Sequence, residues 1–317
     1  MNVYWADDPR DSEEVVRAKA RRVVDYLITI DANSVALAFP FFTSGPTASS
    51  VFPTRSTPSA RRVAIALDEF RGSGLRTSVR PLLDEQALLA VNRRSWRGNI
   101  QPADRDAWFA SYRKLITPYL QAADRAQAAT FIIGAELNSL EGDPRWQALV
   151  TRAKQTFRRE IAYAVNWDSF VSRSTRMPVD HVGVDAYFPV EIGDDASTGT
   201  LAAGWNQWLD RRATGPLPRL ILAEVGLPAE DGAYRHPAAW GNTKGRALNL
   251  AVQERWFTAA CQVARQRKMA GLYWWKIDFH DDPIRADPAN DKHDSFLGRP
   301  GENAIQSCFS AWGSSAR

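Results

Sequence analysis

The sequence contains few of the residues from which metal sites and disulfide frameworks are built. Its 317 residues include only two cysteines and four histidines. Cys261 and Cys308 form neither a Cys-x-x-Cys pair nor a zinc-ligand spacing, and no two histidines stand as His-x-His. Because Cys261 lies in an apolar helical stretch, a buried free thiol is the expected state, with a disulfide to Cys308 as the alternative. A metal-dependent enzyme is therefore not expected.

Long apolar runs and blocks of one charge are missing as well. The longest clean apolar run covers residues 35–42 and contains a proline, whereas a membrane-spanning helix needs about 20 apolar residues. The net charge is only +4, and no block of Lys and Arg suited to a phosphate backbone is present. We therefore expect neither a membrane span nor a nucleic-acid partner. Residues 1–5 lead into acidic residues without a secretory signal, which leaves a cytoplasmic protein or the mature or trimmed form of a secreted one.

Tryptophan, by contrast, is abundant, with twelve residues. With 44% apolar and 24% charged residues, the chain has the composition of a folded globular protein. Tryptophan buries a large area in a core, and it also stacks on flat apolar faces of ligands, including sugars. Part of this number is expected in the core, and the excess favours a ligand-binding cleft.

Eight apolar segments alternate along the chain with amphipathic ones. Most are continuous and apolar, as expected for strands that are buried on both faces of a parallel sheet. The eight predicted strands are residues 2–5, 34–40, 75–82, 130–135, 161–167, 181–187, 219–225 and 271–277.

Helices are predicted between these strands from their apolar periodicity and their end signals. One begins at Asp11 with Glu14 completing a capping box, and another begins at Thr57 and Pro58. A long helix over residues 103–125 contains Pro118, which predicts a kink or a break. The remaining predicted helices begin at Asp143 or cover about residues 201–211, 247–267 and 303–312.

Eight strands separated by helices predict a single (β/α)₈ barrel, with one catalytic domain over residues 1–317. A doubly wound open sheet is the alternative, but its glycine-rich first turn is missing. The polar segments 43–59 and 279–299 are too long for simple turns, and we expect them to be functional loops.

Two glutamates stand where a barrel of this kind carries its catalytic groups, at the carboxyl ends of strands. Glu136 directly follows the segment 130–135, and Glu224 lies near the end of the segment 219–225. Two carboxylates that face each other are what glycoside hydrolysis needs, because one protonates the leaving oxygen and the other attacks the anomeric carbon or activates water. Alternatively, each glutamate only accepts hydrogen bonds from helix amides or pairs with an arginine.

Polar and aromatic residues end three other predicted strands. They are Asn166 and Trp167, Asp185 and Tyr187, and Trp274 and Trp275. Asn166 is placed to bind a sugar hydroxyl, and Tyr187 to hold the nucleophilic carboxylate. Trp275, or Trp274 by strand alternation, would form a platform under the sugar, since only one of the two faces the barrel interior.

The order and spacing of six short segments are similar to those of glycoside hydrolase family 113, the β-mannanase-like branch of a large clan of retaining enzymes. The resemblance runs from about residue 34 to residue 305. The six segments are residues 96–100 (WRGNI), 108–112 (WFASY), 133–137 (IGAEL), 182–189 (VGVDAYFP), 223–226 (AEVG) and 274–276 (WWK).

The resemblance implies that Glu136 is the general acid/base and Glu224 the nucleophile of an endo-β-mannanase-like enzyme. The substrate would be a β-linked oligo- or polysaccharide, with β-1,4-mannan as the first expectation. Tyr187, Asn166 and Trp275 match positions that line the site in that family. The other expected substrate-binding residues are Trp96, Arg80, Asp185, Trp167 and Trp274.

The sequence departs from the family pattern at two positions. Many members of the clan have Asn directly before the acid/base, where it contacts the sugar 2-hydroxyl, but this chain has Ala135. Asn166 is the candidate to replace that contact. A family Lys-Pro dipeptide reads Arg80-Pro81 here, which keeps the charge and changes the hydrogen-bond geometry. Both departures concern the identity of the sugar more than the type of reaction.

We therefore predict a retaining glycosidase in which Glu224 is ionised and Glu136 is protonated at rest. Their carboxyl groups should lie about 5–5.5 Å apart, and the reaction needs no metal and no organic cofactor. Two alternatives remain open, a non-catalytic carbohydrate-binding barrel and a transglycosylase or exopolysaccharide-processing hydrolase on the same fold. The sequence does not indicate the oligomeric state.

Overall fold

All eight predicted strands are confirmed in the computed structural model, which describes residues 1–172, 177–240 and 242–313. The last predicted strand is divided in two by Trp275 and Lys276, which are joined by a cis peptide bond. The strands of the barrel are β1 (Asn2–Tyr4), β2 (Ser34–Thr43), β4 (Arg76–Leu83), β5 (Thr130–Ala135), β6 (Glu160–Asn166), β7 (His181–Asp185), β8 (Ile221–Val225), β9 (Gly271–Trp274) and β10 (Ile277–Asp278).

The strands pair in parallel and in chain order, and the sheet closes on itself. Val3 of β1 lies opposite Leu37 of β2 on one side and Ile277 of β10 on the other. Because β9 and β10 are consecutive, this pairing joins the last strand to the first and makes a single (β/α)₈ barrel. One further strand, β3 (Val51–Phe52), pairs antiparallel with β2.

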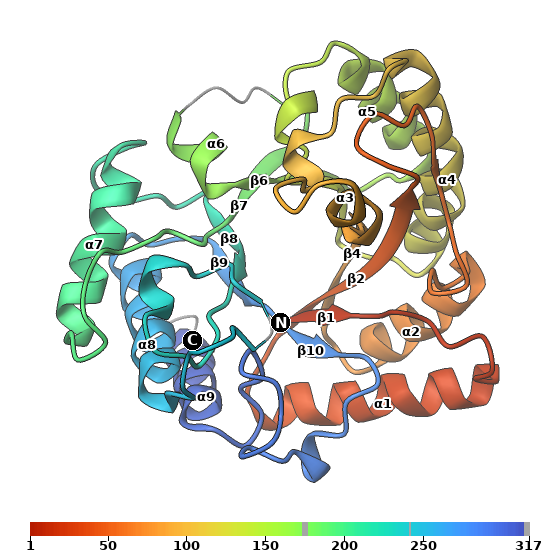
Figure 1. Cartoon of the computed structure of the whole chain (residues 1–317). Helices are drawn as coiled ribbons and strands as arrows, with labels where there is room; N and C mark the ends of the chain where they lie inside the picture. Colours follow the sequence, from red (N-terminus) through yellow and green to blue (C-terminus); the bar gives the residue numbers. More distant parts are fainter. Residues whose placement is uncertain (173–176, 241, 314–317) are drawn as a thin grey trace.

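Helices surround the barrel, as Figure 1 shows. They are α1 (Glu13–Thr29), α2 (Ala60–Gly72), α3 (Gln86–Val91), α4 (Arg105–Arg125), α5 (Arg145–Thr156), α6 (Trp167–Ser172), α7 (Thr198–Asp210), α8 (Leu250–Gln266) and α9 (Pro300–Gly313). In the part of the chain that the structure describes, no helix is both long enough and apolar enough to cross a membrane.

Two helix starts differ from the prediction. Ser12, not Asp11, caps α1, because its hydroxyl accepts the N–H of Val15. Ser59 caps α2 in the same way, while the hydroxyl of Thr57 accepts the N–H of Thr54 in the preceding turn. Ser, Thr and Asp are all good caps, so only the geometry decides which oxygen reaches a free N–H. The helix α4 continues through Pro118, so a break at this proline is excluded.

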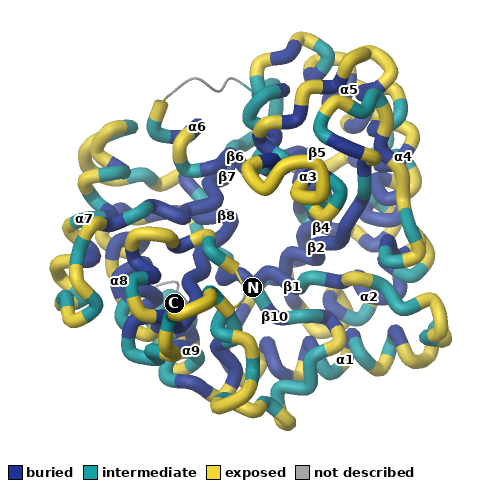
Figure 2. The backbone as a smooth tube through the Cα atoms, viewed as in Figure 1, coloured by how far each residue is buried: buried dark blue, intermediate teal, exposed yellow. Residues whose placement is uncertain are grey.

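The core has an outer and an inner part. The outer core lies between strands and helices and holds six fully buried tryptophans, namely Trp5, Trp108, Trp146, Trp205, Trp256 and Trp274. Six of the twelve tryptophans therefore lie in this core, as expected for part of their number. Figure 2 shows the strands as mostly buried, with helices that alternate between buried and exposed residues.

The inner part is a small cluster within the barrel, and alanine dominates it. Its members are Ala38, Leu82, Ile132, Ala135, Ala162, Ala164, Ala223 and Trp275. Small side chains on the strands leave room for longer polar ones in the interior. Arg80 and Asp185 are both fully buried, and Glu224 is 4% exposed. The sequence of the strands thus builds a barrel interior that can hold charged groups.

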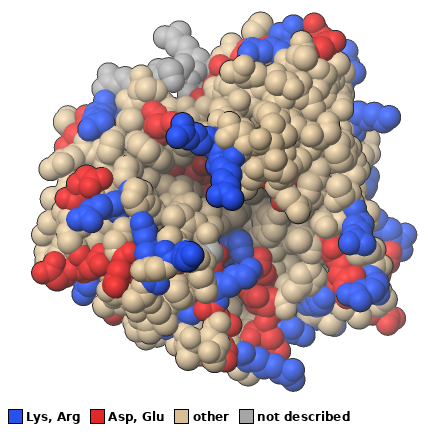
Figure 3. Space-filling view, in the orientation of Figure 1, with Lys and Arg blue, Asp and Glu red and all other residues tan. Residues whose placement is uncertain are grey.

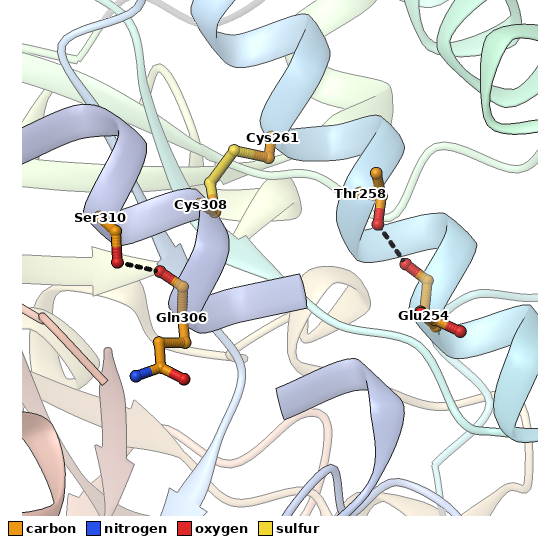
Figure 4. Close-up of a disulfide and its surroundings, with 6 residues drawn as sticks. All are labelled: Glu254, Thr258, Cys261, Gln306, Cys308 and Ser310. Atoms are coloured by element: carbon orange, nitrogen blue, oxygen red, sulfur yellow. Dashed lines mark hydrogen bonds between the residues drawn. A yellow bond between two sulfur atoms is a disulfide. The ribbon is translucent and has the colours of Figure 1, made fainter. Parts of the chain in front are cut away.

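Cys261 and Cys308 form a disulfide, so the expectation of a free thiol was wrong. Cys261 lies on α8 and Cys308 on α9, and these two helices pack against each other with a Cα–Cα distance of 5.8 Å between the cysteines. This distance is typical of disulfides. Figure 4 shows the bond bridging the two helices, beside the hydrogen bond from Ser310 to the backbone of Gln306. The bridge ties the last helix to the barrel.

Candidate active site

Glu136 and Glu224 lie at the carboxyl ends of β5 and β8, where the strand pairing is irregular. Glu136 directly follows β5 and has a φ of 55°, a left-handed conformation that glutamate rarely adopts. Its N–H donates to Ala164 of β6 at 2.8 Å. The register shifts between β5 and β6, between β7 and β8, and between β8 and β9 at this end of the strands. Such shifts turn side chains to new directions and are frequent beside active sites.

Glu224 is held by hydrogen bonds to both of its carboxylate oxygens. Arg80 of β4 donates from Nη2 to Oε1 at 2.5 Å, and the Tyr187 hydroxyl donates to Oε2 at 2.5 Å. Burial and the charge of Glu224 raise the pKa of Tyr187, so its hydroxyl keeps its proton and donates. Both oxygens therefore have the partners that a carboxylate anion needs inside a protein.

Asp185 shares the guanidinium of Arg80 with Glu224. Arg80 donates from Nη2 to Oδ2 of Asp185 at 2.7 Å, and both side chains are fully buried. Burial raises the pKa of Asp185 well above its usual range, and the charges of Glu224 and Glu136 add to this while Arg80 opposes it. One buried cation thus serves two carboxyl groups, and the raised pKa of Asp185 favours its protonated form.

Glu136 has a different environment. Its side chain is 13% exposed, and the Nη1 atom of Arg97 lies 3.8 Å from Oε2. Burial raises the pKa of Glu136 to about 7, the charge of Glu224 raises it as well, and Arg97 and Arg80 oppose these effects. The two glutamates are therefore close enough to influence each other, and Glu136 is partly protonated near neutral pH.

The neighbouring tryptophans divide between the interior and the exterior of the barrel. Trp275 belongs to the inner cluster, 6.2 Å from the ring of Tyr4 and 5.9 Å from the guanidinium of Arg80. Trp274 points outward and packs against Phe257 in the outer core, with 5.0 Å between the ring centres. Trp274 as a substrate-binding residue was therefore wrong, because alternation along the strand turns it away from the site.

Asn166 and Trp167 separate in a similar way. Asn166 ends β6, two residues beyond Ala164 of the inner cluster, and is 9% exposed. Trp167 begins α6, packs against the outer core and contacts Trp208 edge to face at 4.9 Å. Trp167 as a substrate-binding residue stays a prediction. Trp96 is half-buried, with its ring over Gly98, where a Cβ atom would come within 2.3 Å of it.

Four residues near the site were missed by the sequence analysis, namely Tyr4, Glu85, Arg97 and Trp240. Trp240 is 40% exposed and contacts Tyr187 edge to face at 5.3 Å. It lies over Gly226, where a Cβ atom would come within 2.5 Å of the ring. Arg97 and Trp240 lie in loops, which show no apolar periodicity. The only signal for Arg97 was its place in the segment 96–100, which had been noted as a whole.

The loop that carries Trp240 is anchored by a buried carboxylate. Glu230 is fully buried and accepts hydrogen bonds from the backbone of Thr243 at 2.7 Å and from the ring of His293 at 2.8 Å. His293 belongs to the predicted functional loop 279–299. The two loops that follow β8 and β10 therefore support each other beside the barrel.

The arrangement suits acid/base chemistry combined with nucleophilic attack. One carboxyl group holds a proton near neutral pH, and the other accepts hydrogen bonds on both oxygens. Within the described ranges, no group of three or more His, Cys, Asp or Glu side chains is arranged to hold a metal ion. Figure 3 shows a hollow at the centre of this face of the molecule, with acidic atoms visible beneath basic side chains.

Solved structures with this fold include several glycoside hydrolases. The chain is similar to a family 113 β-mannanase from Alicyclobacillus acidocaldarius in complex with ManMIm, with 20% identity, a TM-score of 0.77 and coverage of 98% of this chain and 96% of that chain. Another family 113 β-1,4-mannanase has 16% identity, a TM-score of 0.80 and coverage of 98% of both chains. A GH5_18 protein from Streptomyces cattleya in complex with GlcNAc has 15% identity and a TM-score of 0.60, over 98% of this chain and 79% of that chain.

At these identities the structural similarity establishes the fold alone. No curated protein sequence matches the chain. The model of Glycoside Hydrolase Family 113, however, matches residues 11–297, which is most of the sequence. The chain therefore belongs to glycoside hydrolase family 113.

Proposed function

We propose that the protein is a retaining β-glycosidase that cleaves β-1,4-mannan or a related β-linked polysaccharide. Glu224 acts as the nucleophile and Glu136 as the general acid/base. The observation that carries this proposal is the contrast between the two carboxyl groups, since Arg80 and Tyr187 hold Glu224 while burial keeps a proton on Glu136. The substrate is supported by the solved mannanases of the family.

The first half of the reaction uses both glutamates at once. An oxygen of Glu224 attacks the anomeric carbon, and the bond from that carbon to the leaving oxygen breaks. Glu136 donates its proton to the leaving oxygen, so the product departs as an alcohol. The sugar that remains is joined to Glu224 by an ester bond, and Glu136 is then ionised.

The second half reverses these roles. Glu136 takes a proton from a water molecule, whose oxygen attacks the anomeric carbon and displaces Glu224 as a carboxylate. Two inversions give net retention of configuration at the anomeric carbon. Loss of the Glu224 charge in the ester intermediate lowers the pKa of Glu136, because that charge raises it in the resting state. Glu136 is thus an acid when an acid is needed and a base afterwards.

Other residues would bind the sugar or hold the nucleophile. Trp275 offers an aromatic surface inside the barrel, and Asn166 ends β6, the strand that pairs with β5, from where it would replace the amide that Ala135 lacks. Arg80 and Asp185 are buried beneath Glu224 and would position it rather than touch the substrate. Trp96 stays a predicted substrate contact.

The test is hydrolysis of a panel of β-linked polysaccharides, with product sizing and NMR of the anomeric configuration at early times. We expect cleavage of mannan or glucomannan and retention of the β-configuration. Glu160→Gln is a matched control, because Glu160 lies at the opposite ends of the strands and pairs with Arg76. Inverted products, glycan binding without cleavage, or transfer to acceptor sugars in place of hydrolysis would each contradict the proposal.

A further inference from the structure

A second arginine stands beside Glu136, on the loop between β4 and α4. Arg97 lies 3.8 Å from Glu136, and its Nε and backbone N–H both donate to Oε1 of Glu85, at 2.9 Å and 3.0 Å. The side chain of Arg97 is 15% exposed and that of Glu85 is 27% exposed. Glu85 therefore holds the guanidinium next to the acid/base and places a compensating negative charge beside it.

The contact between Arg97 and Glu136 is an ion pair without a direct hydrogen bond. At 3.8 Å the two atoms attract each other electrostatically but lie beyond hydrogen-bond distance. Arg80 hydrogen-bonds instead to Glu224 and Asp185. Arg97 can thus stabilise a carboxylate at Glu136 without preventing that carboxyl group from taking up a proton.

Several charged groups act on Glu136 from the surrounding elements. Glu224 of β8 and Glu85 of the β4–α3 loop raise its pKa, while Arg97 and Arg80 lower it. The charge of Glu136 in turn acts on Asp185 and Tyr187, which surround Glu224. Among these groups, Glu85 and Arg97 lie on the Glu136 side of the site and make no hydrogen bond to Glu224 in the described structure. They can therefore change the behaviour of Glu136 alone.

We propose that Arg97 and Glu85 are a pair of positioning residues for the acid/base. Arg97 holds the Glu136 carboxylate that remains after proton donation, and Glu85 limits this attraction so that the proton can return. This inference rests on the proposed function, because only an acid/base that changes its protonation state in each turnover needs a balanced counterion. A lone arginine would favour the ionised form in both halves of the reaction, and a site without arginine would favour the protonated form.

The test is an NMR titration of the Glu136 carboxyl carbon in protein labelled with carbon-13 glutamate, with the signal assigned by its loss in Glu136→Gln. In Glu85→Gln the pKa of Glu136 should fall by about one unit, because Arg97 is no longer neutralised. In Arg97→Gln it should rise, and in the double variant it should rise less, because the charge of Arg97 acts on Glu136 more strongly than that of Glu85. Glu160→Gln again serves as the control and should leave the titration unchanged.

The pH dependence of kcat/KM gives a second measurement. It would not change if Glu85 and Arg97 only stabilised the fold. In Glu85→Gln, a fall of about one unit from a pKa near 7 leaves roughly a fifth of the protonated Glu136 at pH 7, so kcat/KM for polysaccharide should fall about fivefold. The high-pH limb of the profile should move to lower pH. An aryl β-mannoside with a very acidic leaving group needs no proton, and its kcat/KM should change little.

An unchanged Glu136 titration in folded Glu85→Gln would overturn this inference, even if the wild-type enzyme cleaves mannan. Should Arg97→Gln fail to fold, Glu85→Gln decides alone, because the Glu85 side chain is partly exposed and the amide oxygen of Gln can still accept the hydrogen bond from Arg97. If the titration shifts as expected but no glycan is cleaved, the charge pair is supported and the proposed function fails. The two results are therefore distinguishable.

Discussion

Glu136 and Glu224 are the same residue type at the ends of two strands of one barrel, but the protein treats them differently. Glu224 is bound on both oxygens by Arg80 and Tyr187, which come from strands or strand ends in the barrel interior. Glu136 has an arginine at 3.8 Å, whose charge is already shared with Glu85. The comparison teaches that hydrogen bonds from a cation and a phenol favour an anion, whereas burial beside a neutralised cation leaves a proton in place.

The largest loss of activity is expected when Glu224, the residue that forms the covalent bond, is replaced. Glu224→Gln should lower kcat on mannan by about four orders of magnitude or more, because no other group replaces the nucleophile. The unfolding temperature should change little, since the amide oxygen can still accept from Arg80 while the amide N–H can donate to the hydroxyl oxygen of Tyr187. Measurable wild-type-like turnover in this variant would remove Glu224 from its assigned role.

Glu136→Gln should have a smaller effect that depends on the leaving group. General acid catalysis contributes about 10²- to 10⁴-fold, so hydrolysis of polysaccharide should fall within this range. Cleavage of an activated aryl β-mannoside should form the ester intermediate at nearly the wild-type rate, and added azide should speed its breakdown. Equal losses on both substrates would show that Glu136 is not the proton donor.

Tyr187→Phe removes one of the hydrogen bonds to Glu224 but keeps the carboxylate. A hydrogen bond to a charged group contributes about 1.5–3 kcal/mol, which corresponds to a loss of about 10- to 150-fold in kcat/KM. Because the Glu136 side of the site is untouched, the high-pH limb should change little. A shift of that limb as large as the loss in rate would argue that the two environments are not separate.

The pH dependence of the wild-type enzyme tests the raised pKa of Glu136. The protonated form of Glu136 is the active acid, and its pKa is raised to about 7, so kcat/KM should be constant below about pH 6 on this limb and fall about tenfold per unit above pH 8. The measurement is kcat/KM against pH with a polysaccharide substrate. If the apparent pKa of the high-pH limb lies near the usual value of a glutamate, the environment described for Glu136 is contradicted.

The smallest effect on activity is expected from removing the disulfide, which lies far from both glutamates. The variant Cys261→Ala/Cys308→Ala removes a bridge that closes a loop of 47 residues, which should lower the free energy of unfolding by about 4 kcal/mol. The pH profile and kcat should be unchanged, because α8 and α9 pack outside the barrel. Denaturant unfolding of the reduced and oxidised wild-type protein provides the matched comparison.

The fold was predictable because the information lies in local apolar patterns. Strands such as residues 130–135 are buried on both faces, so their composition identifies them without knowledge of their partners. Helix starts were less certain, since Asp11 and Ser12 are both capable caps. The disulfide depends on how α8 and α9 pack, and two cysteines that lie 47 residues apart carry no local signal of that packing.

The candidate site was predictable where it lies on strands. Glu136 and Glu224 were found because a charge at the end of an apolar run has no local explanation. The alternation rule left Trp274 and Trp275 open, and only the packing of Trp274 against Phe257 decided between them. Glu85 and Arg97 lie before and after the short helix α3, in the connection from β4 to α4, where the position of a side chain depends on tertiary contacts rather than on sequence periodicity.

The most direct test of the different roles of the two glutamates is to trap the covalent intermediate. The enzyme would be incubated with a 2-deoxy-2-fluoro-β-mannosyl fluoride, digested with pepsin and sequenced by mass spectrometry. We predict one labelled peptide in which the fluorosugar is attached to Glu224, with Glu136 unmodified. A label on another residue, or no label together with inversion of the anomeric configuration, would contradict the account.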